Sequence, residues 1–597
     1  MAPGPEQPPL DGPAGRLEHA LWGAVAGLLC GLVVGLLSWP QSMFPGGEGG
    51  PVVGLALLLV LASMSGAVLA AVVGNRRGGL PLSVSGGLLL GLLTWIAWSL
   101  SVEPLLRGQG PTWSAVAAGQ TLRQLVGDVV QGGLTGATLH GLLSIRARTG
   151  ARAAALALPE RSVPRVVIVG GGFAGVSAAR RFEEHAARGV ALDVTLVSQS
   201  NYLLFTPMLA EVASSALQAR HISVPVRASC PLTRFRRGRV DAVDLERRVL
   251  HVSDGQDLPV VTVPFDHLVL GLGAVPHFRR LPGVEEHAFS LKTLEDATRL
   301  RNHVLGLLEQ AEGEPDAEER RCQLTFAVAG GGFAGTEMIA ELFDLVHGVL
   351  HFYPRIRPQD PRFVLVHSGE RILPELSPQL AGYALDRLRG RGIEFRLATR
   401  VAGATAEAVL LQGGEALPTR TLVWTAGTRP HPLIAGLPAD KGRTGAVRVD
   451  ATLAVGGLEG VWAVGDCAEI PDPDHGGAPY PPTAQHATRE GRALADNVVA
   501  VLRGEAPAHF RFRTIGTLVA LGHRTAVAEV LGRRFSGLAA WLLWRGVYLA
   551  KLPGLERKLR VFFDWSLDLA LSRDIVATAG PCAPAAPPAM VATRVSS

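Results

Sequence analysis

The chain has 597 residues, a net charge of +5 and 48% hydrophobic residues, and its length allows three or four domains. Its basic side chains are almost all arginines without long runs interleaved with aromatic residues, which argues against nucleic acid as a partner and favours a membrane surface. The five cysteines include no CxxC pair, so a local redox disulfide, a zinc knuckle and a secreted disulfide framework are excluded, and no metal site is expected.

The first quarter of the chain predicts an all-α membrane domain. Residues 1–19 are rich in proline and glycine and are predicted to be disordered. Four apolar stretches follow, each close to the roughly 20 residues that cross a bilayer as a helix. They are Leu21–Trp39, Pro51–Val73, Leu80–Ser101 and, with more polar residues, Leu125–Ile145. We therefore expect a four-span transmembrane domain over residues 20–145, followed by a linker over residues 146–164.

Arginines around these stretches predict their orientation. Arg16 precedes the first stretch, Arg76 and Arg77 separate the second from the third, and three arginines follow the fourth. Because basic loops stay on the inner side, we expect a multi-pass protein of a bacterial inner membrane with its catalytic part on the cytoplasmic face. Glycines recur every four residues in the first stretch, which permits close helix packing within the bundle or in a homodimer.

The string Gly-Gly-Gly-Phe-Ala-Gly occurs twice, at residues 170–175 and 330–335. Each copy follows a strand-like apolar run and opens a helical stretch, which is the context of a GxGxxG dinucleotide fingerprint. The glycines allow a tight turn and a close approach to a pyrophosphate at the helix N-terminus. The expected cofactor-binding residues are Gly170, Gly172 and Gly175 in the first loop and Gly330, Gly332 and Gly335 in the second. Together the loops predict an α/β fold with two Rossmann-like domains, one for a flavin and one for a nicotinamide dinucleotide.

A third motif belongs to the flavin site. Residues 460–466 have the pattern of a strand that ends in Gly465 and Asp466. In flavoproteins with two dinucleotides, such a strand returns to the first domain. Gly465 would leave room for the flavin chain, and Asp466 would accept a hydrogen bond from the ribitol of FAD.

Beyond these motifs, the chain resembles a type II NADH dehydrogenase, the single-subunit NADH:quinone oxidoreductase, over residues 165–575. The similar segments are 201–213, 281–288, 291–297, 424–427, 482–487 and 510–527. The resemblance implies FAD in the first Rossmann-like domain, NADH in the second and a quinone tunnel at C-terminal helices on the membrane. It also implies cofactor contacts from Thr206 and Gly427. The expected bounds are 165–290 and 431–530 for the two parts of the FAD domain, 291–430 for the NAD(P)H domain, 531–578 for the membrane-interface helices and 579–597 for a disordered tail.

The resemblance assigns two residues to the chemistry. Glu337 matches an acidic residue between the nicotinamide and quinone sites, where a desolvated carboxylate could relay a proton; the alternative is that it only favours the helix dipole. Gln485 matches an amide beside the quinone head; the alternative is a structural or flavin-edge hydrogen bond. The family often has a second glutamine where this chain has Thr488-Arg489-Glu490, so contacts with the head group are expected to differ.

Two positions depart from the Rossmann pattern, in which an acid ends the second strand and binds a ribose diol. The first domain has Ser198 at that position, so Ser198, Gln199 or backbone must hold the FAD ribose. The second domain has His367, with Arg371 nearby, where the family commonly has a glutamate. Because histidine does not repel a 2′-phosphate, NADPH can be used, although NADH remains the favoured donor.

The C-terminal segment predicts attachment to lipid. Leu538–Leu552 is apolar but too short and too charged to span a bilayer. After Pro553, apolar residues fall on one helical face and basic residues flank them, which is typical of a helix in the membrane interface. The apolar residues are Leu555, Leu559, Phe562 and Leu569. The alternative is a helix that packs on its own domain.

Two other functions remain open. A sulfide:quinone oxidoreductase needs paired cysteines at the flavin, and Cys322 with Cys467 is the only plausible pair. A non-catalytic membrane sensor that binds FAD and NAD(P)H would fit the extra spans and the absent ribose acids. A reductase with a soluble protein acceptor is disfavoured by the membrane helices.

Overall fold

The computed structural model describes residues 13–38, 59–60, 62–70, 79–106, 108, 121–156, 163–254, 260–522, 524–569 and 571–577. The chain divides into two compact units, Met1–Ala157 and Leu158–Ser597. Each unit is described by itself below.

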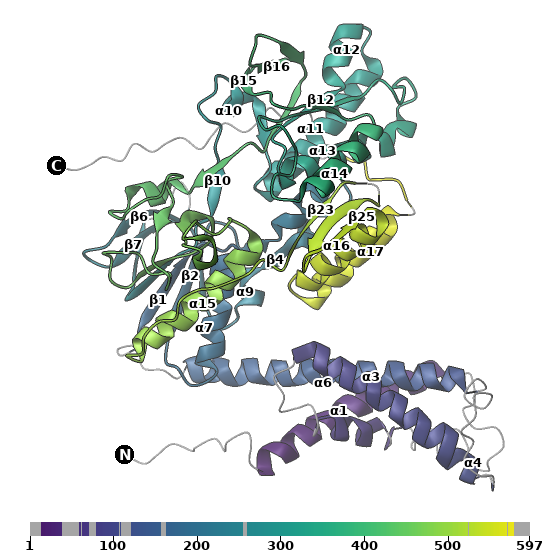
Figure 1. Ribbon diagram of the computed structural model, residues 1–597. Helices are drawn as coiled ribbons and strands as arrows, with labels where there is room; N and C mark the ends of the chain where they lie inside the picture. Colours follow the sequence, from purple (N-terminus) through teal and green to yellow (C-terminus); the bar gives the residue numbers. More distant parts are fainter. Residues whose placement is uncertain are drawn as a thin grey trace. The chain divides into compact units, whose positions relative to one another are not determined.

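The described part of the first unit is helical throughout (Figure 1). Its elements are α1 (Pro13–Ser38), α3 (Gly79–Ala97), the π-helical turn η1 (Trp98–Val102), α4 (Glu103–Leu106) and α6 (Leu122–Leu156). Glycines form the helix contacts: a Cβ on Gly87 would overlap the carbonyl oxygen of Gly132, and one on Gly27 would overlap that of Ala62. The glycine face of the first helix therefore packs within the bundle.

One helical segment of the described residues, Ser83–Val102, is long and apolar enough to cross a membrane, and a shorter apolar segment is Ala20–Leu32. Much of the predicted span Pro51–Val73 lies outside the described residues. The predicted span Leu125–Ile145 lies within α6, which continues to Leu156. Residues 146–156 are therefore helical, because alanine and arginine propagate a helix readily. Likewise α1 begins at Pro13, a favoured residue for the first helical turn, inside the segment predicted to be disordered.

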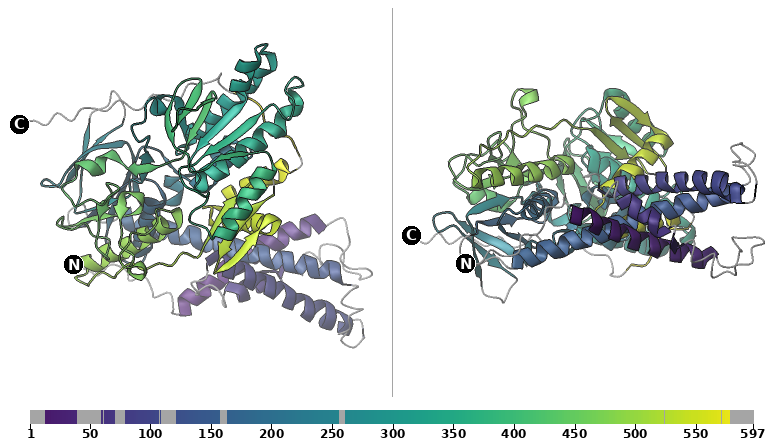
Figure 2. Two further views of the ribbon diagram at one scale, coloured as in Figure 1. Left: turned by 45° about the horizontal axis from the view of Figure 1, so that its top comes forward. Right: turned by 90° about the horizontal axis from the view of Figure 1, so that it is seen from below.

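The second unit contains two five-stranded parallel sheets in separate lobes (Figures 1 and 2). The first sheet has the order β21-β9-β1-β2-β5. Its strands are β1 (Arg165–Val169), β2 (Asp193–Ser198), β5 (Arg234–Arg237), β9 (His267–Leu270) and β21 (Val461–Ala463). The strand β21 pairs with β9, Val461 opposite Leu268, so the chain returns to this sheet after building the other lobe. The helices α7 (Phe173–Ala186) and α15 (Ala484–Leu502) pack together on it.

The second sheet has the order β11-β18-β12-β13-β14. Its strands are β11 (Ala288–Ser290), β12 (Thr325–Ala329), β13 (Arg362–Val366), β14 (Glu394–Arg396) and β18 (Thr421–Trp424). The strands β12 and β18 are buried along their whole length, as expected for a parallel sheet covered on both faces. The main helices are α11 (Leu294–Gly313), which begins with a capping box at Thr293, and α13 (Phe333–Val349). This α/β architecture with two dinucleotide-binding lobes confirms the predicted fold class of the body.

Smaller elements complete the lobes. They are β3 (Tyr202–Leu204), β4 (Ser223–Pro225), β6 (Arg239–Asp244), β7 (Val249–Ser253), β8 (Val261–Pro264), β10 (Ala274–Pro276), β15 (Val401–Ala404), β16 (Ala408–Leu411), β17 (Ala416–Pro418), β19 (Thr428–Pro430), β20 (Val447–Arg448), β22 (Ala468–Glu469), α8 (Leu209–Ala213), α9 (Val226–Ser229), α10 (Val284–His287), α12 (Ala317–Gln323) and α14 (Pro378–Gly390).

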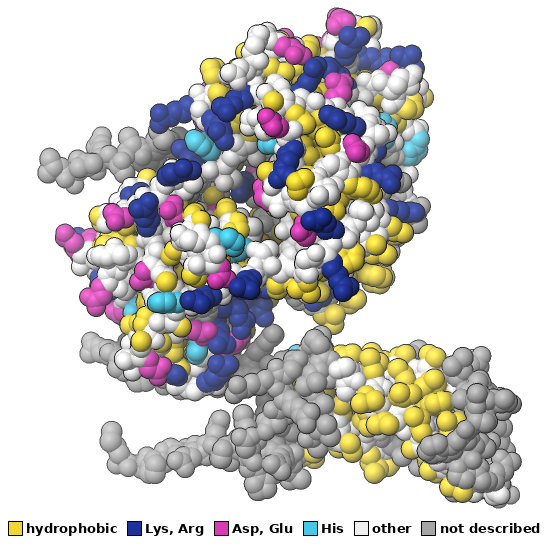
Figure 3. Space-filling view, viewed as in Figure 1, with side chains coloured by type: hydrophobic (Ala, Val, Ile, Leu, Met, Phe, Trp, Pro, Cys, Tyr) yellow, Lys and Arg dark blue, Asp and Glu magenta, His cyan; other side chains and the backbone are white. Residues whose placement is uncertain are grey.

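The C-terminal part is an antiparallel sheet followed by two helices beside the second lobe (Figures 1 and 2). The elements are β23 (Gly516–Ala520), β24 (Ala526–Val530), β25 (Arg533–Ser536), α16 (Gly537–Lys551) and α17 (Leu555–Asp568). In α17, Val561 and Trp565 are buried, whereas Leu559 and Phe562 are about half exposed. Hydrophobic side chains therefore gather on the outer surface of these helices (Figure 3).

Candidate active site

The two glycine loops have the same geometry. The first glycine of each string has a positive φ, +114° at Gly170 and +118° at Gly330, and a Cβ on Gly170 would overlap the carbonyl oxygen of Gly271. A Cβ on Gly175 or Gly335 would overlap the carbonyl oxygen of the first glycine of its own loop. Only glycine fits at these positions, because the backbone turns tightly there and the helix packs directly on the strand.

The helix N-caps leave space for a ligand. Gly172 and Gly332 cap α7 and α13 with nearly identical dihedrals, and a Cβ on either residue would meet nothing within 4 Å. Each cap is therefore open to a ligand at the helix N-terminus, where a pyrophosphate is expected. Two open helix caps, one in each lobe, fit the pyrophosphates of two dinucleotides.

The residues at the ends of the second strands, Ser198 and His367, lie against the glycine loops. The Ser198 Oγ faces Gly171 and the His367 ring faces Gly331. The His367 Nδ1 accepts a hydrogen bond from the Gly331 amide at 3.0 Å, and burial lowers the pKa of His367. The imidazole is therefore neutral at pH 7 and holds the loop, a contact that the sequence did not predict.

The return strand opens onto a cavity. A pocket of about 120 Å³ lies against Gly465, Asp466, Thr483 and Glu490. Among the described residues, no hydrogen bond or ion pair engages the Asp466 side chain, so it is available to a ribitol hydroxyl. Glu490, which the sequence analysis did not select, accepts a hydrogen bond from the Gly465 amide at 2.8 Å. Burial raises the pKa of Glu490 to about 7, and it fixes the loop that Gly465 occupies. These groups fit the FAD chain.

Glu337 lies in the first turn of α13, directly after the second glycine loop. Its carboxylate accepts a hydrogen bond from the Ala520 amide at 3.0 Å. Desolvation by the surrounding side chains is the main cause that raises the pKa of Glu337 to about 8, with a smaller contribution from the negative charge of Glu341 one turn later. The group is therefore mostly protonated at pH 7, which suits a proton donor.

Gln485 lies in the first turn of α15, after its N-cap Thr483. Its Nε2 is 3.4 Å from the Gly516 carbonyl oxygen, and its Oε1 is buried without a partner among the described residues. The strand β23 thus contacts Gln485 at one end and Glu337 at the other, through Gly516 and Ala520. Four residues of strand place these contacts about 13 Å apart.

An aromatic series that the sequence did not predict runs from the first glycine loop to α16. Phe173 in that loop packs edge-on against Phe205 at 5.7 Å, Phe205 against Tyr548 at 6.2 Å, and Tyr548 against Trp544 at 4.7 Å between ring centres. The negative charge of Glu337 contributes to a raised pKa of Tyr548, after desolvation as the main cause. The series therefore reaches the neighbourhood of Glu337 and provides apolar, water-poor walls.

The two remaining predicted residues lie at loop positions. Thr206 begins a 3₁₀ turn after Phe205 and is exposed, which leaves its hydroxyl free to meet a ligand. Gly427 follows β18 with a φ of +149°, and its carbonyl oxygen accepts a hydrogen bond from the His277 amide at 3.1 Å. Both residues lie in loops that follow sheet strands.

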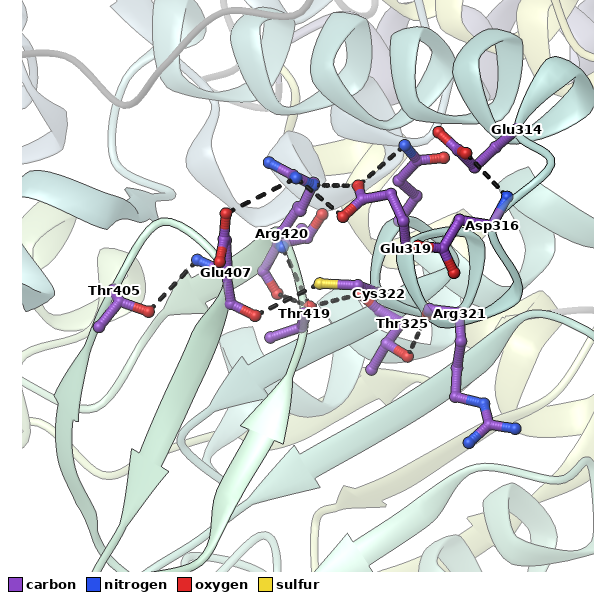
Figure 4. A network of polar contacts seen from close by, with 12 residues as sticks. Glu314, Asp316, Glu319, Arg321, Cys322, Thr325, Thr405, Glu407, Thr419 and Arg420 are labelled. Atoms are coloured by element: carbon purple, nitrogen blue, oxygen red, sulfur yellow. Dashed lines mark hydrogen bonds and ion pairs between the residues drawn. The ribbon is translucent and has the colours of Figure 1, made fainter.

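Cys322 and Cys467 lie in different lobes and do not form a redox pair. Cys322 lies in a polar network on α12, where its thiol donates to the Glu407 carbonyl oxygen at 3.3 Å beside the ion pair of Arg420 and Glu319 (Figure 4). Cys467 donates to the Leu270 carbonyl oxygen in the other lobe. Both are free, and burial raises the pKa of each thiol to about 11, so both are protonated at pH 7. The sulfide:quinone alternative is not supported by this geometry.

Known proteins match the chain over the second unit. A family model for pyridine nucleotide-disulphide oxidoreductase matches residues 164–491, and one for the NDH2 C-terminal domain matches residues 515–574. A probable NADH dehydrogenase of Dictyostelium discoideum is 30% identical over 418 residues, 69% of this chain and 90% of that protein. The type II NADH:quinone oxidoreductase NdhA of Mycobacterium tuberculosis is 30% identical over 422 residues, 68% of this chain and 86% of that protein.

A solved structure shares the fold. NDH2 from Plasmodium falciparum, in complex with NADH, has a TM-score of 0.64 and 20% identity, and covers 70% of this chain and 100% of its own. The fold and the two glycine loops define a pyridine nucleotide-dependent oxidoreductase. The chain belongs to the pyridine nucleotide-disulphide oxidoreductase family, in its type II NADH dehydrogenase group. The predicted enzyme class is thereby confirmed.

Proposed function

We propose that this protein is a membrane-bound, FAD-dependent NADH:quinone oxidoreductase that does not pump protons. When bound, FAD supplies the hydride and electron transfer between the nicotinamide and the quinone. The observation that carries the proposal is the pair of matched glycine loops, with Glu337 and Gln485 held at the two ends of β23. Relatives named as quinone oxidoreductases support it.

The protein side chains orient the reactants and supply a proton. The open N-caps at Gly172 and Gly332 would bind the two pyrophosphates, and Asp466 would hold the ribitol. Glu337, protonated at pH 7, would give a proton to the reduced quinone and recover it from solvent. The Gln485 Nε2 would donate to a quinone carbonyl oxygen, and its Oε1 would accept from a hydroquinone hydroxyl.

NADH is the proposed donor, and NADPH a second one. A glutamate at position 367 would repel a 2′-phosphate, but the neutral His367 does not. Arg371 lies four residues further on, with its Nη2 bonded to the Pro374 carbonyl oxygen at 2.7 Å.

The membrane supplies the quinone in this proposal. The four-span domain over residues 20–145 would anchor the chain in a bacterial inner membrane, with the second unit on the cytoplasmic side. The exposed apolar residues of α17, together with Arg557, Lys558 and Arg560, would lie in the interface of anionic lipid. A homodimer is also part of the proposal, formed through surfaces other than the glycine face, which packs within the bundle.

Steady-state kinetics test the proposal. Detergent-solubilised protein should oxidise NADH with a short-chain quinone as acceptor, and a parallel series with NADPH would give the donor preference. Flavin that NADH reduces but quinone does not reoxidise would favour the redox-sensor alternative. Absence of NADH oxidation by flavin-loaded protein would overturn the proposal.

A further inference from the structure

A second charged residue lies beside Gln485. Arg489, one helical turn later in α15, donates from Nη1 to the Gln485 carbonyl oxygen at 2.9 Å. Its guanidinium carbon is 4.1 Å from the centre of the Phe512 ring. No ion pair joins Arg489 to a carboxylate among the described residues, whereas Arg492, on the same helix, has Glu184 at 3.3 Å. Arg489 is therefore held in place but not neutralised.

Lys551, the last residue of α16, brings a second positive charge to this region. It likewise has no carboxylate partner among the residues that the structure describes. Desolvation lowers the pKa of Lys551, and the charge of Arg489 lowers it further, so the two cations act on each other. A lysine in a last helical turn also favours the helix dipole, but that role does not account for Arg489.

Arg489 is partly buried, so its desolvation carries a modest cost that a nearby anion would offset. Burial lowers the pKa of Arg489, which means that its charged form is partly desolvated, and only a neutral carbonyl and an aromatic face compensate it. An anion that binds next to Gln485 would remove this cost. Because the acceptor site of the proposed function lies at Gln485, the natural anion is the acceptor itself.

We propose that Arg489, assisted by Lys551, binds negative charge on the head group of the acceptor, so that the site favours a quinone in its reduced, anionic form. This inference rests on the proposed function and extends it. A para-quinone that accepts two electrons and one proton from reduced flavin becomes a hydroquinone monoanion. One further proton, from Glu337 or water, completes the hydroquinone. A cation at the oxygen stabilises the monoanion more than the neutral quinone and thereby favours the reduction.

Two probes of nearly the same shape test the charge preference. The compound 2-hydroxy-1,4-naphthoquinone is an anion at pH 7 because its hydroxyl group is acidic, whereas its methyl ether, 2-methoxy-1,4-naphthoquinone, is neutral. Binding of each to the oxidised, flavin-loaded protein would be measured by fluorescence quenching, which does not depend on turnover. We expect the wild type to bind the anion roughly tenfold more tightly than the ether, about 1.4 kcal/mol.

Four variants separate the effect of Arg489 on probe binding from the effect of surface charge in general. Arg489→Gln should bring the two affinities within roughly threefold of each other, Arg489→Lys should retain most of the preference, and Lys551→Gln should reduce it. Arg492→Gln is the matched control, because it removes the same charge from the same helix at a residue that already has a carboxylate partner. The control should keep the wild-type preference.

The outcomes distinguish this inference from the proposed function. If the wild type reduces a neutral short-chain quinone but binds both probes equally, or if Arg489→Gln keeps the preference, the inference is wrong and the proposed function stands. An equal loss of the preference for the anionic probe in Arg492→Gln would also overturn the inference, because long-range charge would then explain that preference. If the flavin-loaded wild type reduces no quinone, the proposed function fails and the inference fails with it.

Discussion

Replacement of Glu337 by Gln removes the proton that we assign to quinone reduction but keeps the shape of the side chain. The Ala520 amide that donates to the carboxylate can still donate to the amide oxygen of glutamine. We therefore expect Glu337→Gln to fold and to bind flavin. Flavin reduction by NADH should proceed at close to the wild-type rate, while reoxidation by quinone should slow by roughly 10²-fold, a typical contribution of a positioned proton donor.

The raised pKa of Glu337 determines how the rate of flavin reoxidation changes with pH, in size and in sign. The pKa of Glu337 is raised from 4.5 to about 8. The carboxyl is then about 90% protonated at pH 7 and about 10% protonated at pH 9, so the reoxidation rate of the wild type should fall roughly ninefold between them. The pKa of Glu337 is higher in the folded protein than in the unfolded chain. The free energy of unfolding therefore falls as the pH rises from 4.5 to 8, by at most about 5 kcal/mol. Glu337→Gln should escape this loss.

Stopped-flow absorbance at the flavin band measures the two half-reactions separately between pH 6 and pH 9, and thermal unfolding at the same values measures the stability. Glu318→Gln, at an exposed position on α12, is the control and should behave as wild type. Equal reoxidation rates for wild type and Glu337→Gln at pH 7 would refute the proton-donor role. A wild-type rate that does not change up to pH 9 would refute the raised pKa.

Three further changes test the cofactor loops and the membrane surface. Gly172→Ala should lower flavin retention, measured by absorbance, without lowering the melting temperature of the flavin-free protein, because a Cβ there meets no protein atom; a fall in both would contradict the open cap. His367→Glu should raise the ratio of kcat/KM for NADH over NADPH by roughly 10²-fold through repulsion of the 2′-phosphate, and an unchanged ratio would place the phosphate elsewhere. Phe562→Asp should reduce turnover of a long-chain quinone in proteoliposomes but not of a short-chain quinone in detergent. Val501→Asp, at an exposed position of α15, is the control. Equal effects of Phe562→Asp on both acceptors would argue against a place for α17 in the membrane interface.

Local patterns predicted the parts of the site that depend on a few adjacent residues. The glycine strings require a strand before them and a helix after them, and the structure has β1 and α7 around the first and β12 and α13 around the second. The pattern of residues 460–466 likewise predicted β21, although the strand ends at Ala463, and Gly465 and Asp466 begin a 3₁₀ turn. These elements could be predicted because turn geometry and strand burial are written in consecutive residues.

Contacts between distant segments could not be predicted in this way. The strand β23 connects Glu337 to Gln485 through two backbone groups, which carry no sequence signal. Glu490 is buried against Gly465 because α15 packs on the first sheet, and nothing in its neighbours in sequence distinguishes it from an exposed glutamate. The bond from Gly331 to His367 similarly depends on how two strands end side by side.

In the proposed function, one flavin takes a hydride from a nicotinamide nucleotide and passes two electrons to a quinone. The most direct measurement is an anaerobic titration of the purified protein followed by its visible spectrum. We expect a bound flavin whose absorbance is bleached by one equivalent of NADH and restored by one equivalent of quinone. A protein that cannot be loaded with flavin, or a bleached flavin that quinone leaves reduced, would contradict the proposed function.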